Sequence, residues 1–188
     1  SKLQDAETLF ADSPIRITTS GKRHLGAAIG TDEFKDSYLQ EKVEEWCNSM
    51  RRLSKIASSQ PQAAYTAFIF GEQHKYTYFM RTIKDIAELI KPLDDVISKE
   101  FIPALFGREI SSNDREILSL PVRGGLGIRI QHEIAAFSYN ASTTISAPLV
   151  SKITTQCQTL PCPDEVNTAK SEAVKLLRHQ AERKLEKI

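Results

Sequence analysis

The most regular spacing of hydrophobic residues covers positions 61–83. Apolar side chains recur there about every 3.6 residues, which predicts one long helix with an aromatic core face. Pro61 suits the first helical position, because its missing N–H would have no acceptor inside the helix. Such a helix depends on neighbouring elements for its stability. The expected core positions are Tyr65, Phe68, Ile69, Tyr76, Phe79, Met80 and Ile83. The expected polar face carries Gln62, Thr66, Gln73, Thr77, Arg81 and Lys84.

A second long helix is expected over residues 31–57. Thr31 is the expected N-cap, and two acidic residues follow it, where negative charge meets the helix dipole. The apolar seam alternates steps of four and three residues and consists of Leu39, Val43, Trp46, Met50, Leu53 and Ala57. The short connection at 58–60 favours an antiparallel helical pair, in which we expect Trp46 to face Phe68.

The C-terminal half is also expected to be helical. We expect Asp85 to cap a short helical turn and Pro92 to open a longer helix, kinked at Pro103 and ended by Gly107. The order expected after it is a capping cluster at 111–114, a short helix through Leu118, an irregular glycine loop at 120–128, helices at 132–144 and 148–158, and a loop at 159–163. The terminal helix has an apolar stripe of Val166, Ala169, Ala173, Leu176 and Leu177.

The only β structure that the pattern predicts lies near the N-terminus. A helix is expected over residues 2–11, with no N-cap at Ser1, so the chain reads as a piece of something longer. Alternating apolar residues at 15–18 predict a strand, 20–22 has turn chemistry, and 24–29 is expected to return as a second strand containing Gly26. The predicted fold class is therefore mainly α, a helical bundle with a small N-terminal β hairpin.

Composition narrows the function only slightly. The 188 residues are 40% hydrophobic and 26% charged, and the formal net charge of +1 gives no overall basic signature. No apolar run is long enough to span a membrane and no signal-peptide pattern opens the chain, so we expect an intracellular protein with no membrane partner. Cys157 and Cys162 could form a disulfide, but free thiols are the favoured interpretation. The histidines and cysteines lack metal-site spacing, so no metal site is predicted.

Five strings occur in order along the chain: GKRHLGAAIG (21–30), QPQAAYTAF (60–68), HKYTYFMRTI (74–83), FIPALFGR (101–108) and LPVRGGLGI (120–128). Together they resemble the C-terminal part of a retroelement reverse transcriptase of the non-LTR type, over about residues 1–150. The resemblance implies a palm edge with a primer-grip-like hairpin at 1–30, a helical thumb-like domain at 31–128 and a C-terminal helical extension at 129–188. The family pattern usually has one more residue before GGLGI, so this loop is expected to be shortened.

The resemblance implies the primer–template-holding part of an RNA-directed DNA polymerase. Its partners would be an RNA–DNA or DNA primer–template and the upstream palm and fingers domains of the same polyprotein. Phe10–Ser13 resembles an F-A-D-D box, but Ser13 replaces the second acid, so the pair of aspartates that would bind two metal ions is incomplete. No catalytic residue is therefore assigned, no cofactor is expected in this chain, and Mg²⁺ is expected in the palm. We expect the chain alone to be inactive as a polymerase.

The expected nucleic-acid-binding residues are Lys22, Arg23, His24, Leu25, Gly26, Arg81 and Lys84. The resemblance implies that Gly26 lets the backbone approach the primer, whereas without it a bulge glycine is the simpler interpretation. Asp94 and Asp95 form an acidic pair that we assign to the first turn of a helix and not to a metal site. The alternative function is a decayed or domesticated fragment that serves only as a helical interaction module.

Overall fold

The computed structural model describes residues 1–121 and 124–186. Within these ranges the chain is mainly helical with one small antiparallel hairpin near the N-terminus, which confirms the predicted fold class. The α-helices are α1 (Lys2–Leu9), α2 (Asp32–Ala57), α3 (Pro61–Ala67), α4 (Gln73–Thr82), α5 (Ala87–Val96), α6 (Ile102–Phe106), α7 (Ser112–Ser119), α8 (Gln131–Thr154) and α9 (Pro163–Leu185). The strands are β1 (Gly21–His24) and β2 (Ala27–Gly30), and two π-helical turns are η1 (Phe68–Glu72) and η2 (Ile97–Phe101).

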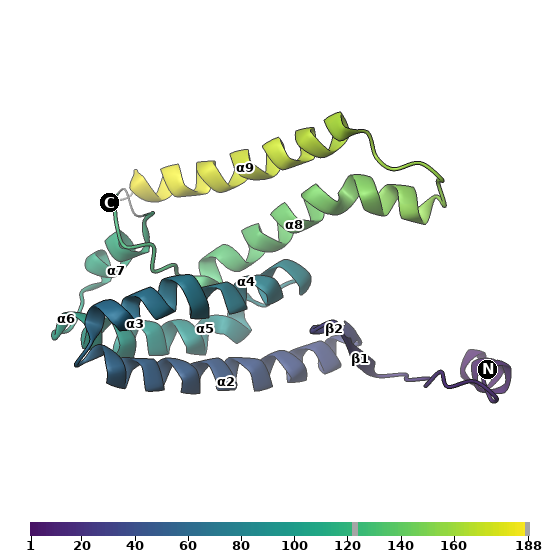
Figure 1. Cartoon of the computed structure of the whole chain (residues 1–188), viewed down its shortest axis with the longest axis horizontal. Helices are drawn as coiled ribbons and strands as arrows, with labels where there is room; N and C mark the ends of the chain where they lie inside the picture. The colour runs from purple at the N-terminus through teal and green to yellow at the C-terminus, as the bar shows by residue number, and fades with distance from the viewer. Residues whose placement is uncertain (122–123, 187–188) are drawn as a thin grey trace.

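The helices lie in successive layers (Figure 1). α2 runs along one side, α3, α4 and α5 form the next layer, and α8 and then α9 follow on the side away from α2. Direct packing joins α2 to α3 and α5, α8 to α4 and α5, and α9 to α8. The hairpin lies at one end of α2, and α1 stands apart beyond it without a buried residue.

α2 confirms the prediction made from its apolar seam. The Thr31 hydroxyl accepts a hydrogen bond from the Phe34 N–H at 3.3 Å, so Thr31 is the N-cap. The seam residues are buried, except for Leu53, which is half-buried. The partner of Trp46 was predicted wrongly. Its ring packs on Tyr76 and Phe79, with centroids 5.1 and 4.9 Å away, whereas Phe68 packs on Phe101 at 5.0 Å.

The long helix predicted at 61–83 is helical over that length but contains a π turn. Pro61 occupies the predicted first position. The π turn η1 adds one residue between Phe68 and Gln73, which shifts the helix phase by that residue. Gln73 is therefore buried, although its sequence position placed it on the polar face. The remaining polar-face residues are exposed or half-buried.

Two predicted helix starts at proline are wrong. The first is Pro92, which lies inside α5. The cap predicted at Asp85 is also wrong, because Asp85 is an exposed residue with φ +57° that makes no cap. Pro148 lies inside α8, so the two helices predicted at 132–144 and 148–158 are one. Each proline removes one backbone hydrogen bond from its helix. In α5, buried residues lie on both sides of Pro92, and α8 as a whole packs on α4, α5 and α9, so tertiary packing accompanies both helices. Gly107 does end α6, in the left-handed conformation.

Other C-terminal predictions had mixed outcomes. Ser111 caps α7 in a reciprocal capping box with Asp114, as the cluster at 111–114 predicted. In α9, Ala169 and Ala173 are buried, but Leu176 is exposed. The side chain of Leu177 and the loop residues Val122 and Arg123 lie outside the described residues. No helix within the described ranges is long and apolar enough to cross a membrane.

The β strands of the hairpin differ from those predicted. Residues 15–18 form no strand, and the segment 20–22, predicted as the turn, leads into β1. β1 and β2 pair in the register Gly21↔Gly30 to His24↔Ala27, so the turn is Leu25–Gly26 and Gly26 is not in a strand. Ser1 also proves to be a helix N-cap, because its side chain and that of Gln4 form a capping box.

Candidate nucleic-acid interface

The tip of the hairpin is a tight two-residue turn. Leu25 has φ +48° and Gly26 has φ +85°, and two positive φ values in succession are typical of the type I′ turns that connect hairpin strands. A side chain on Gly26 would meet the Tyr78 ring only at ordinary contact distance, 3.8 Å. Gly26 is therefore required by its backbone conformation and not by crowding within the chain. The structure replaces the bulge interpretation with a turn.

Two tyrosines hold the backbone of this turn. The Tyr78 hydroxyl, from α4, donates a hydrogen bond to the Leu25 carbonyl at 3.0 Å. The Tyr38 hydroxyl, from α2, donates one to the Gly26 carbonyl at 3.3 Å. Ala28 of β2 is buried and joins the main core. The backbone of the hairpin tip is thus anchored to both helices.

The predicted contact residues on the hairpin are all exposed except Gly26, which is half-buried. Leu25 is 87% exposed despite its positive φ, so the turn presents an apolar side chain to solvent. The Arg23 guanidinium lies 5.6 Å from the centroid of the Tyr38 ring, within the range of a cation–π interaction. Within the described ranges, no acidic side chain forms an ion pair with Lys22, Arg23 or His24.

The two predicted contacts beyond the hairpin differ from one another. Arg81 follows Tyr78 by three residues, so it lies on the face of α4 that holds the hairpin tip. It is exposed and pairs with no described acidic residue. Lys84 lies beyond the end of α4 and pairs with Asp85 at 3.5 Å. The structure therefore brings Arg81 toward the hairpin residues, while Lys84 already has an acidic partner.

Sequence reasoning assigned no role to Tyr38 and Tyr78. Tyr78 lies off the core phase of its helix, and an aromatic residue in such a position is a signal of a contact outside the main core. Nothing in the sequence indicates that its partner would be the carbonyl of Leu25, 53 residues earlier. That pairing depends on how the hairpin folds back along α2 and α4.

A second polar cluster lies at the N-terminus of α8, and Asp94 is at its centre. Asp94 is buried, and its two carboxylate oxygens accept hydrogen bonds from the N–H groups of Gln131 and His132, both at 2.8 Å. The His132 ring Nδ1 lies 2.7 Å from the same carboxylate. Asp94 is near the end of α5, so its assignment to a helix first turn is wrong. It complements the dipole of another helix, while Asp95 forms an exposed ion pair with Lys99 at 2.8 Å.

Side chains from three elements hold the loop that leads into α8. Arg115 of α7 donates to the carbonyls of Ile128 and Arg129 at 2.7 and 3.1 Å. Burial lowers the pKa of the Arg115 guanidinium, and the negative charge of nearby Asp94 opposes this shift. The buried Gln73 accepts from the Arg129 N–H at 3.0 Å, and the Tyr65 hydroxyl donates to the Leu126 carbonyl at 2.6 Å. These bonds satisfy backbone groups, so the cluster is structural.

The described residues contain no group of three or more His, Cys, Asp or Glu side chains that could hold a metal ion. Asp12, in the string that resembles F-A-D-D, is exposed in the turn after α1. This part of the chain therefore offers no described carboxylate cluster for metal-assisted chemistry.

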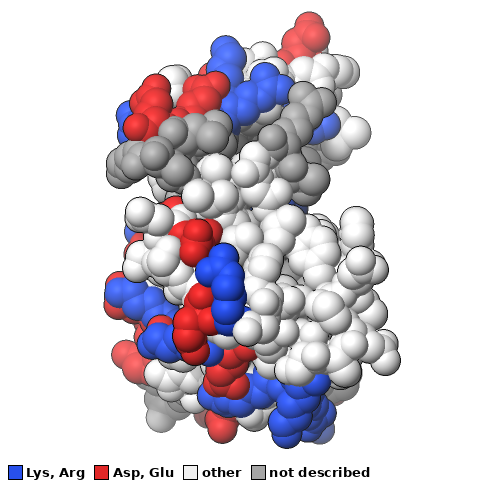
Figure 2. Space-filling view, turned by 90° about the vertical axis from the view of Figure 1, so that its left-hand side faces the viewer, with Lys and Arg blue, Asp and Glu red and all other residues white. Residues whose placement is uncertain are grey.

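Figure 2 shows the end of the molecule that carries α6 and α7, away from the hairpin. Lys and Arg are interspersed with Asp and Glu along one side of this face, and much of the rest carries no charge. The described basic residues there form no continuous positive patch. Because phosphate binding needs cations that are not neutralised by neighbours, the hairpin end is the better candidate interface.

Comparison with protein-family models, with curated proteins and with solved structures finds no match to this chain. The resemblance to a reverse transcriptase therefore stays a prediction.

Proposed function

We propose that this chain is the primer–template-holding part, primer grip and thumb, of an RNA-directed DNA polymerase of a retroelement. The observation that supports it best is the anchored hairpin tip. Tyr38 of α2 and Tyr78 of α4 hold its backbone, Lys22, Arg23 and His24 are exposed on β1, and Arg81 is exposed one helical turn after Tyr78. Cationic side chains on an anchored hairpin can bind phosphates irrespective of base sequence. A polymerase needs such binding because it must hold primers of any sequence.

In this proposal the chemistry of nucleotide addition belongs to the palm. The catalytic carboxylates and the Mg²⁺ ions that they bind would come from that domain, and this chain would position the primer end. Even a 1 Å displacement of a reacting group can lower a reaction rate by about 10²-fold. A hairpin that holds the primer end in place would therefore affect the rate of nucleotide addition directly. Such a polymerase would act inside the cell.

The N-terminal 30 residues support the proposed contact with an upstream palm. Leu9, Ile15 and Ile29 are all more than half exposed, and neither outer edge of the two-stranded hairpin has a β partner among the described residues. An isolated hairpin is marginally stable in water, and exposed strand edges are sites at which another strand pairs. We therefore assign this segment as the palm-facing edge, with thumb-like packing at 31–128 and a helical extension at 129–188.

Binding of an RNA–DNA hybrid tests the proposal. The logarithm of duplex affinity falls with the logarithm of salt concentration with a slope of about −0.9 per phosphate contact. The Lys22→Ala/Arg81→Ala variant should bind more weakly at low salt, and its slope should be flatter by about 2. Fluorescence anisotropy of a labelled hybrid, titrated at several salt concentrations, measures both quantities.

The matched control is Lys170→Ala/Lys175→Ala, which removes the same charge from exposed positions on α9. This control should keep the wild-type slope. Equal losses in the two variants would mean that binding follows net charge alone, and the interface assignment would be wrong. A chain that binds no hybrid even at low salt would instead favour the helical interaction module, the alternative function.

A further inference from the structure

The connector between α8 and α9 carries two of the three cysteines of the chain. Cys157 lies two residues after the C-cap of α8, Thr155, and Cys162 directly precedes Pro163, the first residue of α9. Both thiols are free and exposed, whereas Cys47 is buried in α2. The chain thus presents two accessible thiols of the same connector and one inaccessible thiol that serves as an internal reference.

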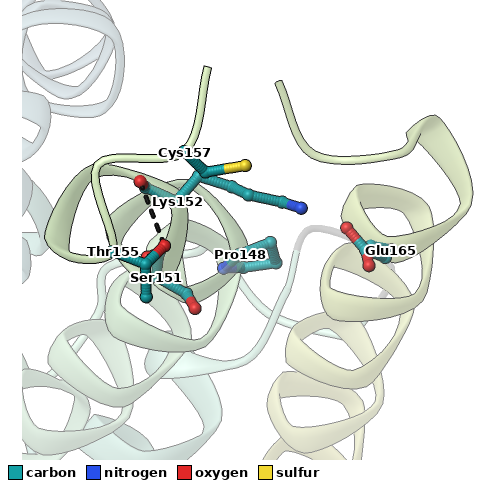
Figure 3. A pocket seen from close by; sticks show the side chains of 6 residues that line it. All are labelled: Pro148, Ser151, Lys152, Thr155, Cys157 and Glu165. Carbon is teal, nitrogen blue, oxygen red and sulfur yellow. Dashed lines mark hydrogen bonds between the residues drawn. The ribbon is translucent and has the colours of Figure 1, made fainter. Parts of the chain in front are cut away.

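Cys157 lines a pocket of about 420 Å³ between the end of α8 and the start of α9, with Pro148, Ser151, Lys152, Thr155 and Glu165. In Figure 3 the side chains of Cys157 and Lys152 project in the same direction, toward Glu165 of α9. A small oxidant can therefore reach the sulfur from solvent, and a cation lines the space into which the sulfur points.

The backbone and a hydrogen bond set the position of this sulfur. The Cys157 N–H donates to the Lys152 carbonyl at 2.9 Å, after a reversal at Gln156 with φ +52°. The Cys157 Sγ lies 3.2 Å from the Thr159 Oγ1. Hydrogen bonds from the hydroxyl and backbone of Thr159, and to a smaller degree the charge of Lys152, lower the pKa of the Cys157 thiol. Burial raises the pKa of the Cys47 thiol.

We propose that Cys157 is the peroxide-sensitive thiol of this chain and that Cys162 resolves its oxidised form to a disulfide. In the first step the Cys157 thiolate attacks one oxygen of a hydroperoxide. An S–O bond forms, the O–O bond breaks, and the leaving oxygen takes up a proton, so Cys157 becomes a sulfenic acid and the hydroperoxide becomes an alcohol or water. In the second step the Cys162 sulfur attacks this sulfenic sulfur. The S–S bond forms, and the hydroxide leaves as water with the Cys162 proton.

The chemical consequence is a covalent tie between the two ends of the connector. Gln158, Thr159 and Leu160 between the cysteines are exposed, so this segment can rearrange without disturbing a buried side chain. The disulfide would fix the connector at which the chain turns back after α8, so that α9 runs along α8. This inference does not depend on nucleic-acid binding, because its residues lie outside the proposed interface.

Alkylation rates test the first half of the inference. With iodoacetamide at neutral pH, the reduced folded chain should react fastest at Cys157, more slowly at Cys162 and slowest at Cys47. Thr159→Val should slow the reaction of Cys157 by about three- to tenfold, because it removes a hydrogen bond that favours the thiolate. In urea the three rates should become similar. Equal rates at Cys157 and Cys162 in the folded chain, or no effect of Thr159→Val, would overturn the assignment.

Oxidation by a stoichiometric amount of hydrogen peroxide tests the second half. Both cysteines lie in the tryptic peptide 153–170, so disulfide formation appears as the loss of two hydrogen atoms from that peptide in mass spectrometry. Cys162→Ser should instead accumulate a sulfenic acid at Cys157, trapped by dimedone, and Cys157→Ser should leave Cys162 reduced. Disulfide-linked dimers as the main product, or oxidation of Cys162 at the wild-type rate in Cys157→Ser, would refute the pair.

Discussion

The buried Asp94 offers the sharpest test of how this fold is held together. Its carboxylate is the acceptor for the first two N–H groups of α8 and lies against the His132 ring. Asp94→Ala would leave these N–H groups without an acceptor where water has little access. A hydrogen bond to a charged group contributes about 1.5–3 kcal/mol, and breaking a buried charged network typically costs about 3–5 kcal/mol. We expect Asp94→Ala to lower the free energy of unfolding by about 3–5 kcal/mol.

Asp94→Asn refines the same test with little change in shape. The amide keeps one oxygen as an acceptor but points an NH₂ group at a second donor, so we expect a loss of about 2–3 kcal/mol. Against a total stability of about 5–15 kcal/mol, both variants should shift the urea midpoint clearly. Hydrogen exchange should also speed up at the Gln131 and His132 amides.

Asp95→Asn is the matched control, because it makes the same change at the next position of the same helix. Its side chain is exposed and pairs only with Lys99 in the described structure, so its loss should stay below about 0.5 kcal/mol. If Asp94→Asn is no more destabilising than Asp95→Asn, the carboxylate does not hold α8. Unchanged exchange at the two amides would lead to the same conclusion.

Two further predictions concern the aromatic core. Trp46→Ala should lower the free energy of unfolding in urea by about 3–5 kcal/mol, because its ring packs on Tyr76 and Phe79. Phe70→Ala is the control, because that ring is 77% exposed, and it should change the free energy of unfolding by no more than about 0.5 kcal/mol. Equal effects of the two variants would contradict the α2–α4 packing. The buried Tyr76 hydroxyl has no partner among the described residues, so Tyr76→Phe should leave the neutral-pH stability unchanged or raise it by about 1 kcal/mol. Burial raises the pKa of Tyr76 in the folded state, so stability falls as the pH rises above the unfolded value of about 10, and Tyr76→Phe should unfold at higher pH. A loss above about 1 kcal/mol in Tyr76→Phe would show that the hydroxyl has a partner.

The sequence alone determined the features that depend on a few neighbouring residues. The seam of α2, the cap at Thr31, the start at Pro61 and the stop at Gly107 were predicted correctly. Each follows from a local cause: apolar spacing, an N-cap hydroxyl, a proline without an N–H, or a glycine with positive φ. The mainly helical class followed from the same signals. The resemblance supplied the expected nucleic-acid contacts on the hairpin, which stay a prediction, but the sequence did not place the turn at Leu25 and Gly26.

The tertiary structure decided everything that depends on partners distant in sequence. Proline is a local helix breaker, yet α5 and α8 continue through Pro92 and Pro148. Both helices pack on other helices, and most helical stability in proteins comes from such packing and not from local propensity. The π turn after Phe68 moves Gln73 inward to the loop at Arg129. Asp94 complements a helix that begins 37 residues later, and no local rule contains that contact. Such pairings arise from how the helices meet, so a pattern along one helix cannot predict them.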